Sequence, residues 1–118
     1  FDDHRRSQRS GKREARAGGA ESICDALLAP TPGTLTWSIN RQTVDSFVAV
    51  SDSQVEQAMA FAFRHLKLVV EPGGAVALAA LLSGAFEARG RTVVATLSGG
   101  NVDPRLCARL IGAEAVSG

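Results

Sequence analysis

The stretch Thr92-Val93-Val94-Ala95-Thr96-Leu97-Ser98-Gly99-Gly100-Asn101 decides the fold class that the sequence predicts. It is an apolar, β-branched run that stops at a small hydroxyl, two glycines and an amide. Such a run predicts a buried parallel strand that opens into a glycine turn, and Asp103-Pro104 predicts the start of a helix. Because ligands of open α/β sheets sit at the carboxyl ends of strands, Ser98 is a candidate site residue.

A second candidate lies in Leu68-Val69-Val70-Glu71-Pro72-Gly73-Gly74-Ala75. Glu71 places a lone carboxylate at the start of a predicted helix that is apolar through Leu82 and extends to about Ala88. Pro72 suits the first helical turn, and Gly73-Gly74 would let another group approach the backbone closely. The sequence therefore predicts a second site segment here.

Short patterns predict the remaining elements of residues 34–118. A helix is expected from Thr34 to near Asp45, a short strand over Phe47–Val50, and a helix from Pro104 to Ile111 that Gly112 ends. The segment after Val50 predicts a helix start at which the side chain of Ser51, Asp52 or Ser53 accepts backbone N–H groups, with a Ser53–Glu56 capping box. Its apolar stripe consists of Val55, Ala58, Met59, Ala62 and Leu66.

The element order favours an α/β fold, with part of an open, mainly parallel sheet flanked by helices. Residues 1–33 are expected to form a loop-rich connector with a short basic helix, and residues 34–118 the carboxyl-terminal α/β portion of a catalytic domain. Two strands alone make a poor sheet, the first residue is Phe1, and the only methionine is Met59. We therefore expect further polypeptide upstream.

Composition limits the classes of protein. The chain has 118 residues, 45% of them hydrophobic, which suffices for one domain with a core. Its longest apolar stretch, Ala75–Leu82, is far shorter than the ~20 residues of a membrane helix, so no membrane partner and a cytoplasmic location are expected. Cys24 and Cys107 lack metal-type spacing and are predicted to be packing residues.

The charge is nearly balanced, with a formal net value of +1. Residues 1–16 are locally basic, with six Lys/Arg against three Asp/Glu. No aromatic residues interleave these charges for base stacking. A solvated helix face is therefore expected here, and no nucleic-acid partner.

Several of these motifs, in this order, resemble the carboxyl-terminal part of threonine/serine dehydratases. That family consists of pyridoxal-phosphate enzymes of fold type II, the tryptophan-synthase-β-like fold, and includes serine racemase. The similarity covers nearly the whole chain. The segments that carry it are Phe1–His4, Ser22–Leu27, Val50–Asp52, Leu66–Leu82 and Leu97–Asp103.

The resemblance implies which residues meet the cofactor. Ser98 corresponds to the serine that hydrogen-bonds the pyridine nitrogen of pyridoxal 5'-phosphate, with Gly99 beside it, and Glu71 to a glutamate near the ring. The residues alone leave alternatives open: Ser98 as a helix-capping turn residue, and Glu71 as an acid that the helix dipole favours.

The resemblance also implies a divalent cation, such as Mg, near the cofactor. Its ligands in this chain would be the Asp3 carboxylate and the backbone carbonyl of Phe1, with a glutamate upstream of residue 1. From the residues alone, Asp3 is a solvated charge near a terminus.

The chain departs from the family pattern in one decisive respect. The Schiff-base lysine motif and the glycine-rich phosphate loop are absent from these residues, and the only lysines are Lys12 and Lys67. Lys67 matches a non-catalytic position, so the chain alone is expected to be inactive. Cys24 and Ala26 also replace the Ala and Gly that often flank the aspartate matched by Asp25.

The activity that the resemblance implies is a lyase reaction, in which threonine or serine loses its β-hydroxyl and yields a 2-oxo acid and ammonia. The expected partners are a hydroxy amino acid substrate, the amino-terminal part of the same enzyme and further copies in a homo-oligomer. The alternatives are a serine racemase or another hydroxy-amino-acid dehydratase of the family, and, from another class, a non-catalytic α/β interaction module.

Overall fold

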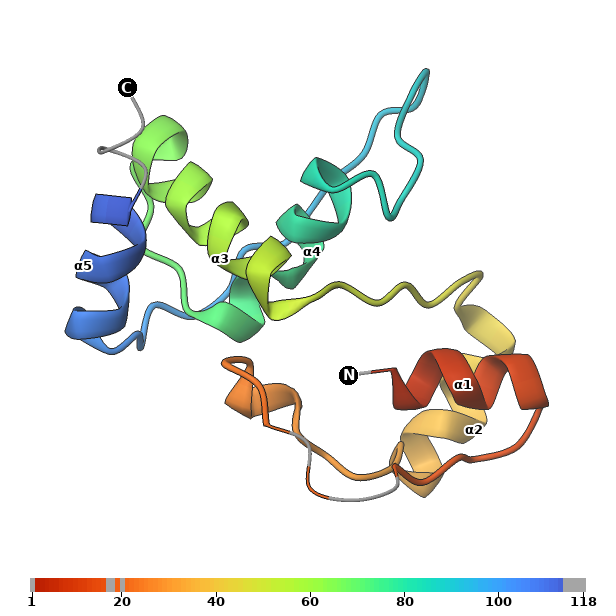
Figure 1. The fold of residues 1–118 in the computed structure, drawn as a ribbon. Coiled ribbons are helices and arrows are strands. Elements are labelled where there is room, and N and C mark those ends of the chain that lie inside the picture. The colour runs from red at the N-terminus through yellow and green to blue at the C-terminus, as the bar shows by residue number, and fades with distance from the viewer. Residues whose placement is uncertain (1, 17–18, 20, 114–118) are drawn as a thin grey trace.

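Three helices from residues 52–113 form the main packing unit, as the computed structural model of residues 2–16, 19 and 21–113 shows (Figure 1). They are α3 (Asp52–Phe61), α4 (Pro72–Leu82) and α5 (Pro104–Ala113), and α3 packs against both of the others. The core between them is built mainly from small side chains. Its buried members are Cys24, Val55, Ala58, Met59, Ala62, Val70, Ala75, Ala79 and Leu110.

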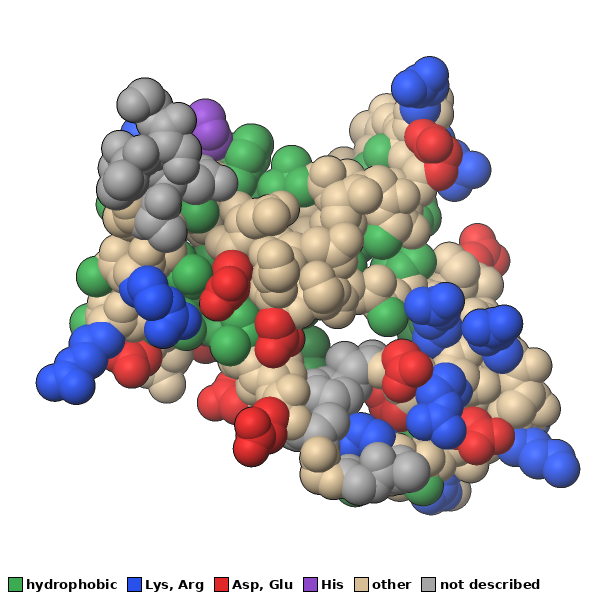
Figure 2. Space-filling view, viewed as in Figure 1, with side chains coloured by type: hydrophobic (Ala, Val, Ile, Leu, Met, Phe, Trp, Pro, Cys, Tyr) green, Lys and Arg blue, Asp and Glu red, His purple; other side chains and the backbone are tan. Residues whose placement is uncertain are grey.

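The first half of the chain forms a separate pair of helices, α1 (Asp3–Ser10) and α2 (Thr34–Thr43) (Figure 1). The loop between them carries the 3-10 turn η1 (Asp25–Leu27). The Gln8 side chain joins α1 to the segment after α2, because its Nε2 donates to the Asp45 carbonyl over 2.9 Å. Arginines of α1 are exposed among acidic side chains, as predicted for a solvated face (Figure 2). The division at residue 33 stays a prediction.

α3 begins with a capping box, although it lies two positions earlier than the predicted Ser53–Glu56 box. The Ser51 hydroxyl accepts the Gln54 N–H at 3.2 Å, and the Gln54 Oε1 accepts the Ser51 N–H at 2.8 Å. The Ser53–Glu56 prediction was wrong because Ser53 already lies inside the helix, whereas Ser51 has the extended backbone of an N-cap.

The predicted stripe on α3 is confirmed except at its end. Val55, Ala58, Met59 and Ala62 are buried, but Leu66 is 44% exposed. The chain widens into a π-helical turn, η2 (Ala62–Leu66), which ends at Lys67 in the left-handed conformation. A π turn holds more residues than an α turn, so the i, i+4 spacing no longer keeps Leu66 on the buried face.

α4 starts where the sequence predicts, with Glu71 as N-cap and Pro72 in the first turn. It ends at Leu82 and not near Ala88, because Gly84 adopts a left-handed backbone that stops the helix. Ala75 and Ala79 are fully buried, so the absence of large side chains lets α3 approach. No helix in the described part of the chain has the length and apolar character of a membrane span.

The two predicted strands are not formed in the described residues, so the predicted sheet is not confirmed. Neither Phe47–Val50 nor Thr92–Leu97 lies in a strand, and the Val94 side chain is 90% exposed. A strand exists only through hydrogen bonds to a neighbouring strand, and these segments have no such neighbour within the described ranges. α5 begins at Pro104 as predicted and continues through Gly112.

Candidate functional site

The two candidate segments lie against each other. The Glu71 N–H donates to the Gly99 carbonyl over 3.0 Å, and the Asn101 N–H donates to the Glu71 Oε2 over 3.2 Å. Glu71 therefore binds the turn through both its backbone and its carboxylate. Segments that are about thirty residues apart in sequence thus form one structure, the turn Ser98–Asn101 on the amino end of α4.

Two glycines make this close approach feasible. A Cβ at Gly74 would overlap the Ser98 carbonyl oxygen, and a Cβ at Gly99 would overlap the Glu71 carboxylate. Gly99 also has a φ of +72°, a left-handed conformation that favours glycine. The predicted close approach at Gly73-Gly74 is thus confirmed at Gly74.

Ser98 is exposed on this turn. Its hydroxyl makes no hydrogen bond to the residues that the structure describes. It does not cap the helix that follows, since the Arg105 N–H is accepted by Asp103 Oδ1 at 2.8 Å. The Ser98 hydroxyl is therefore open to a ligand, and the alternative of a helix cap is not what the geometry shows.

Glu71 is half-buried and does not cap α4 with its side chain. Its carboxylate instead bonds the Asn101 N–H, so it is more than an acid placed near a helix dipole. This contact fixes the shape of the turn that carries Ser98. The sequence indicated both segments but not the hydrogen bond between them. A glutamate next to a proline does not predict which N–H, thirty residues later, its carboxylate accepts.

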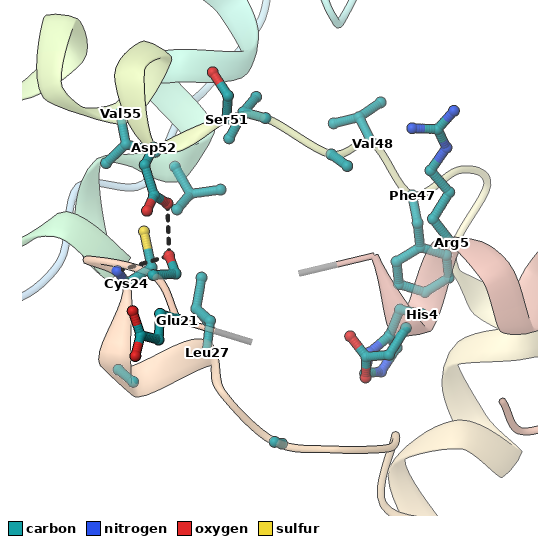
Figure 3. Close-up of a pocket in the computed structure, with 17 residues that line it drawn as sticks. His4, Arg5, Glu21, Cys24, Leu27, Phe47, Val48, Ser51, Asp52 and Val55 are labelled. Atoms are coloured by element: carbon teal, nitrogen blue, oxygen red, sulfur yellow. Dashed lines mark hydrogen bonds and ion pairs between the residues drawn. The ribbon is translucent and has the colours of Figure 1, made fainter. Parts of the chain in front are cut away.

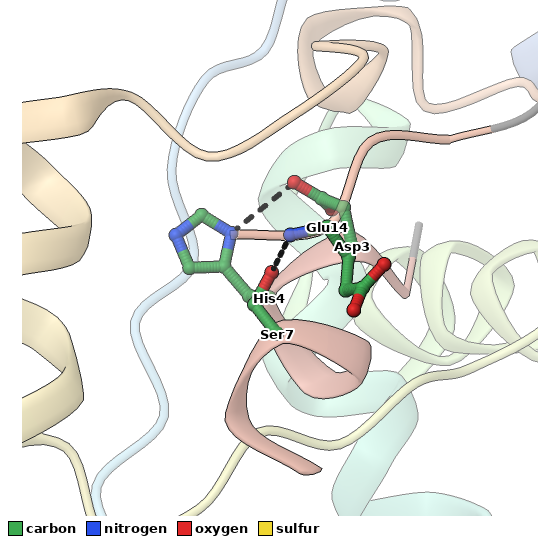
Figure 4. A network of polar contacts seen from close by, with 4 residues as sticks. All are labelled: Asp3, His4, Ser7 and Glu14. Carbon is green, nitrogen blue, oxygen red and sulfur yellow. Dashed lines mark hydrogen bonds and ion pairs between the residues drawn. The ribbon is translucent and has the colours of Figure 1, made fainter. Parts of the chain in front are cut away.

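Asp3 lies away from this turn, at the start of α1. It is 7% exposed, and its Oδ2 is 3.4 Å from His4 Nδ1 (Figure 4). The His4 ring packs against that of Phe47, with 5.1 Å between the ring centroids. Asp3 is thus buried and not the solvated charge that its position suggests. The backbone carbonyl of Phe1 lies outside the described residues. Among the residues that are described, no three His, Cys, Asp or Glu gather to hold a metal.

A hollow of about 540 Å³ separates the two halves of the molecule (Figure 3). Asp3 and His4 of α1 line one side, and Cys24, Asp52 and Val55 line the other. Neither Ser98 nor Glu71 lines it. The hollow is therefore a gap between α1 and the helical core, and it is distinct from the Ser98 turn.

One residue of this region has a contact that the sequence did not reveal. Asp52 was predicted only as one of three candidates for capping, yet its carboxylate accepts the Ser22 hydroxyl at 2.6 Å and the Ile23 N–H at 3.1 Å. Nearby Cys24 is 4% exposed, as predicted for a packing residue, and this burial raises the pKa of its thiol. No local sequence signal links positions 22 and 52.

Comparison with known proteins now defines the class. The profile of the pyridoxal-phosphate-dependent enzyme family matches residues 2–99, and the chain belongs to this family. It is 34% identical over 105 residues to the L-threonine ammonia-lyase of Thermotoga maritima, covering 89% of this chain and 26% of that protein. It is 39% identical over 98 residues to the phenylserine dehydratase of Ralstonia pickettii, covering 82% and 30%.

The fold agrees with this assignment. The structure of maize serine racemase matches 96% of this chain and 36% of its own length, with a TM-score of 0.79 and 33% identity. The chain thus spans about a quarter to a third of these relatives. The resemblance to threonine/serine dehydratases is confirmed at the level of the family.

The residues of the turn fit part of a pyridoxal-phosphate site. Ser98 offers an exposed hydroxyl, and the missing side chains of Gly99 and Gly100 leave room for the Glu71 carboxylate and the Val69 carbonyl that pack against the turn. Neither lysine belongs to the turn: Lys12 is exposed just after α1, and the Lys67 Nζ donates to the Arg64 carbonyl at 2.7 Å. An exposed hydroxyl on a fixed turn is thus compatible with one side of a cofactor site, and neither lysine adds an amine to the turn.

Proposed function

We propose that this chain is the carboxyl-terminal part of a pyridoxal-phosphate-dependent threonine/serine dehydratase. The complete protein would convert a small hydroxy amino acid to a 2-oxo acid and ammonia. The observation that carries this proposal is the open Ser98 hydroxyl on a turn that Glu71 holds in place. The identity to a threonine ammonia-lyase and to a phenylserine dehydratase supports the reaction class.

The roles of the residues follow from their chemistry. Bound pyridoxal phosphate supplies an acceptor for the electrons of the substrate's α-carbon. Ser98 is proposed to hydrogen-bond the ring nitrogen, and its uncharged hydroxyl does not hold a proton there as a carboxylate would. A weaker electron acceptor favours prompt loss of the β-hydroxyl. Glu71 orients Ser98 through its hydrogen bonds to Gly99 and Asn101, and Gly99 leaves room for the Glu71 carboxylate.

The chain by itself is proposed to be inactive. Proton transfer at the α-carbon needs an amine near the substrate, and neither Lys12 nor Lys67 belongs to the Ser98 turn. The missing amine and the phosphate site are assigned to the remainder of the complete protein. No step of the proposal uses a divalent cation, and the expectation for Asp3 and Phe1 stays a prediction.

Serine racemization is the second candidate, because the maize serine racemase aligns with 96% of the chain. Both reactions begin with proton removal at the α-carbon, and they differ in whether the β-hydroxyl leaves. Incubating the complete protein with L-serine and L-threonine separates them. Formation of 2-oxo acid supports dehydration, D-serine without 2-oxo acid supports racemization, and neither product with no cofactor absorbance supports the non-catalytic module.

The role of Ser98 is tested by Ser98→Ala in the complete protein. We expect kcat/KM for 2-oxo acid formation to fall by roughly tenfold or more, with a shift of the cofactor absorbance band, because the proposed hydrogen bond to the ring nitrogen is lost. Ser83→Ala is the matched control, since Ser83 is an exposed serine at the other end of α4. Equal behaviour of the two variants would contradict the role.

A further inference from the structure

The Asp52 carboxylate joins the start of α3 to the segment before η1. Its Oδ1 accepts the Ser22 hydroxyl at 2.6 Å, and its Oδ2 accepts the Ile23 N–H at 3.1 Å. Figure 3 shows Asp52 directed toward this segment beside Cys24. Hydrogen bonds to an ionised carboxylate are stronger than neutral ones, and here both oxygens serve the same short segment.

This pair of bonds fixes the backbone that follows. The Ser22 hydroxyl donates to Asp52 and also accepts the Cys24 N–H at 3.0 Å. Cys24 is thereby held in the core with 4% exposure, and its carbonyl accepts the Leu27 N–H at 2.9 Å to form η1. Asp52 therefore determines where η1 lies.

η1 in turn contacts the amino end of α4. The two elements pack against each other, with Ala26 and Leu27 of η1 facing the Gly73 backbone at the first turn of α4. The next residue, Gly74, faces the Ser98 carbonyl, and its N–H bonds the Glu71 carbonyl at 3.0 Å. A continuous series of contacts thus runs from Asp52 to the Ser98 turn.

We propose that Asp52 is a positioning residue of the cofactor site. It holds the segment Ser22–Leu27 against the amino end of α4 and so keeps Glu71 and the Ser98 turn in register. This inference rests on the proposed function. It distinguishes Asp52 from an ordinary acid at a helix start, for which Asp103 is the example, since among the described residues the Asp103 carboxylate accepts only the Arg105 N–H two residues later.

The test uses the complete protein with the variants Asp52→Ala and Asp52→Asn, and Asp103→Ala as the matched control. Two readouts are taken. One is the alkylation rate of Cys24 in the cofactor-free protein, resolved by peptide mass spectrometry with Cys107 as internal reference. The other is the visible circular dichroism of bound pyridoxal phosphate, which reports how the ring is held.

For Asp52→Ala we expect Cys24 alkylation to rise about tenfold or more and the cofactor signal to fall, because the segment is released. Asp52→Asn keeps one acceptor oxygen for Ser22 and should lie between wild type and Asp52→Ala. Asp103→Ala removes a cap of α5 that makes no bond to the segment Ser22–Leu27, so it should leave both readouts within about twofold of wild type.

The outcomes that overturn the inference are distinct. Unchanged Cys24 alkylation in Asp52→Ala would mean that the carboxylate does not hold the segment. Faster alkylation with an unchanged cofactor signal would remove the positioning role, and so would equal effects of Asp103→Ala. Should Asp52→Ala fail to fold, Asp52→Asn decides by the same criteria. A wild-type protein that binds no cofactor would refute the proposed function and with it the positioning role, while Cys24 alkylation still decides whether Asp52 holds the segment.

Discussion

Gly99 has a left-handed backbone conformation, and the Glu71 carboxylate lies where a side chain at this position would begin. Its φ is +72°, and an added Cβ would overlap the Glu71 carboxylate. We expect Gly99→Ala in the complete protein to lower the free energy of unfolding by about 1–2 kcal/mol for the backbone and roughly 1–3 kcal/mol more for the overlap. Urea unfolding measures the sum.

Gly90→Ala separates these two contributions. Gly90 has nearly the same φ, +73°, but open space where a Cβ would stand. It should show the backbone contribution alone. Equal losses at Gly90 and Gly99 would mean that Glu71 moves aside without penalty, and the tight fit of the turn would not matter.

Cys24 gives stability a dependence on alkaline pH. Burial raises the pKa of its thiol, so the folded protein keeps this proton to a higher pH than the unfolded chain does. The resulting stabilisation is complete below about pH 8.5, the ordinary thiol pKa, and is lost as pH rises through the folded value. Urea unfolding at pH 7 and pH 10 should show a smaller decline for Cys24→Ala than for wild type. Parallel declines would exclude this contribution.

At the scale of elements, the start of α3 tests the observed capping box against the expected one. Ser51→Ala removes the oxygen that accepts the Gln54 N–H and should cost about 1 kcal/mol. Ser53→Ala, inside the first turn and exposed, should change stability by less than about 0.5 kcal/mol. Thermal unfolding of both variants measures the difference. The reverse ranking would restore the Ser53–Glu56 box.

The helices could be predicted because their signals are local. Pro72 in the first turn, the serines near residue 51 and the small-residue stripe each act within one or two turns. The strands could not be confirmed, because a strand is defined by a partner and not by its own sequence. The end of α4 was predicted too late, because the apolar pattern continues to about Ala88. Gly84 ends the helix earlier by adopting a left-handed backbone conformation.

The site was predictable to the same extent. Ser98 was indicated by a strand-end pattern and Glu71 by a helix-start pattern, and their segments do meet. The contacts of Asp52 with Ser22 and Ile23 could not be predicted. No local pattern shows which loop packs against the start of a helix about thirty residues later. The burial of Asp3 was likewise invisible in a charged amino-terminal segment.

For the whole molecule, the exposed apolar side chains indicate surfaces that would be more stable in contact with other polypeptide than in water. Val94 is 90% exposed and Leu35 75%. We expect the chain alone to associate with itself as concentration rises, because large apolar patches on a free surface drive association. Light scattering should show less association for Val94→Asp than for Thr92→Asp, an exposed polar position in the same segment. Equal scattering would assign the association elsewhere.

The two hydrogen bonds between Glu71 and the Ser98 turn have a consequence for where the chain can accept insertions. These bonds close a loop of residues 72–98, which consists of α4 and the extended segment after it (Figure 1). The loop is exposed around Gly90. The entropy of closing such a loop grows only slowly with its length. Residues inserted near Gly90 would therefore leave the hydrogen bonds of Glu71 intact, and this loop can vary in length without loss of the Ser98 turn.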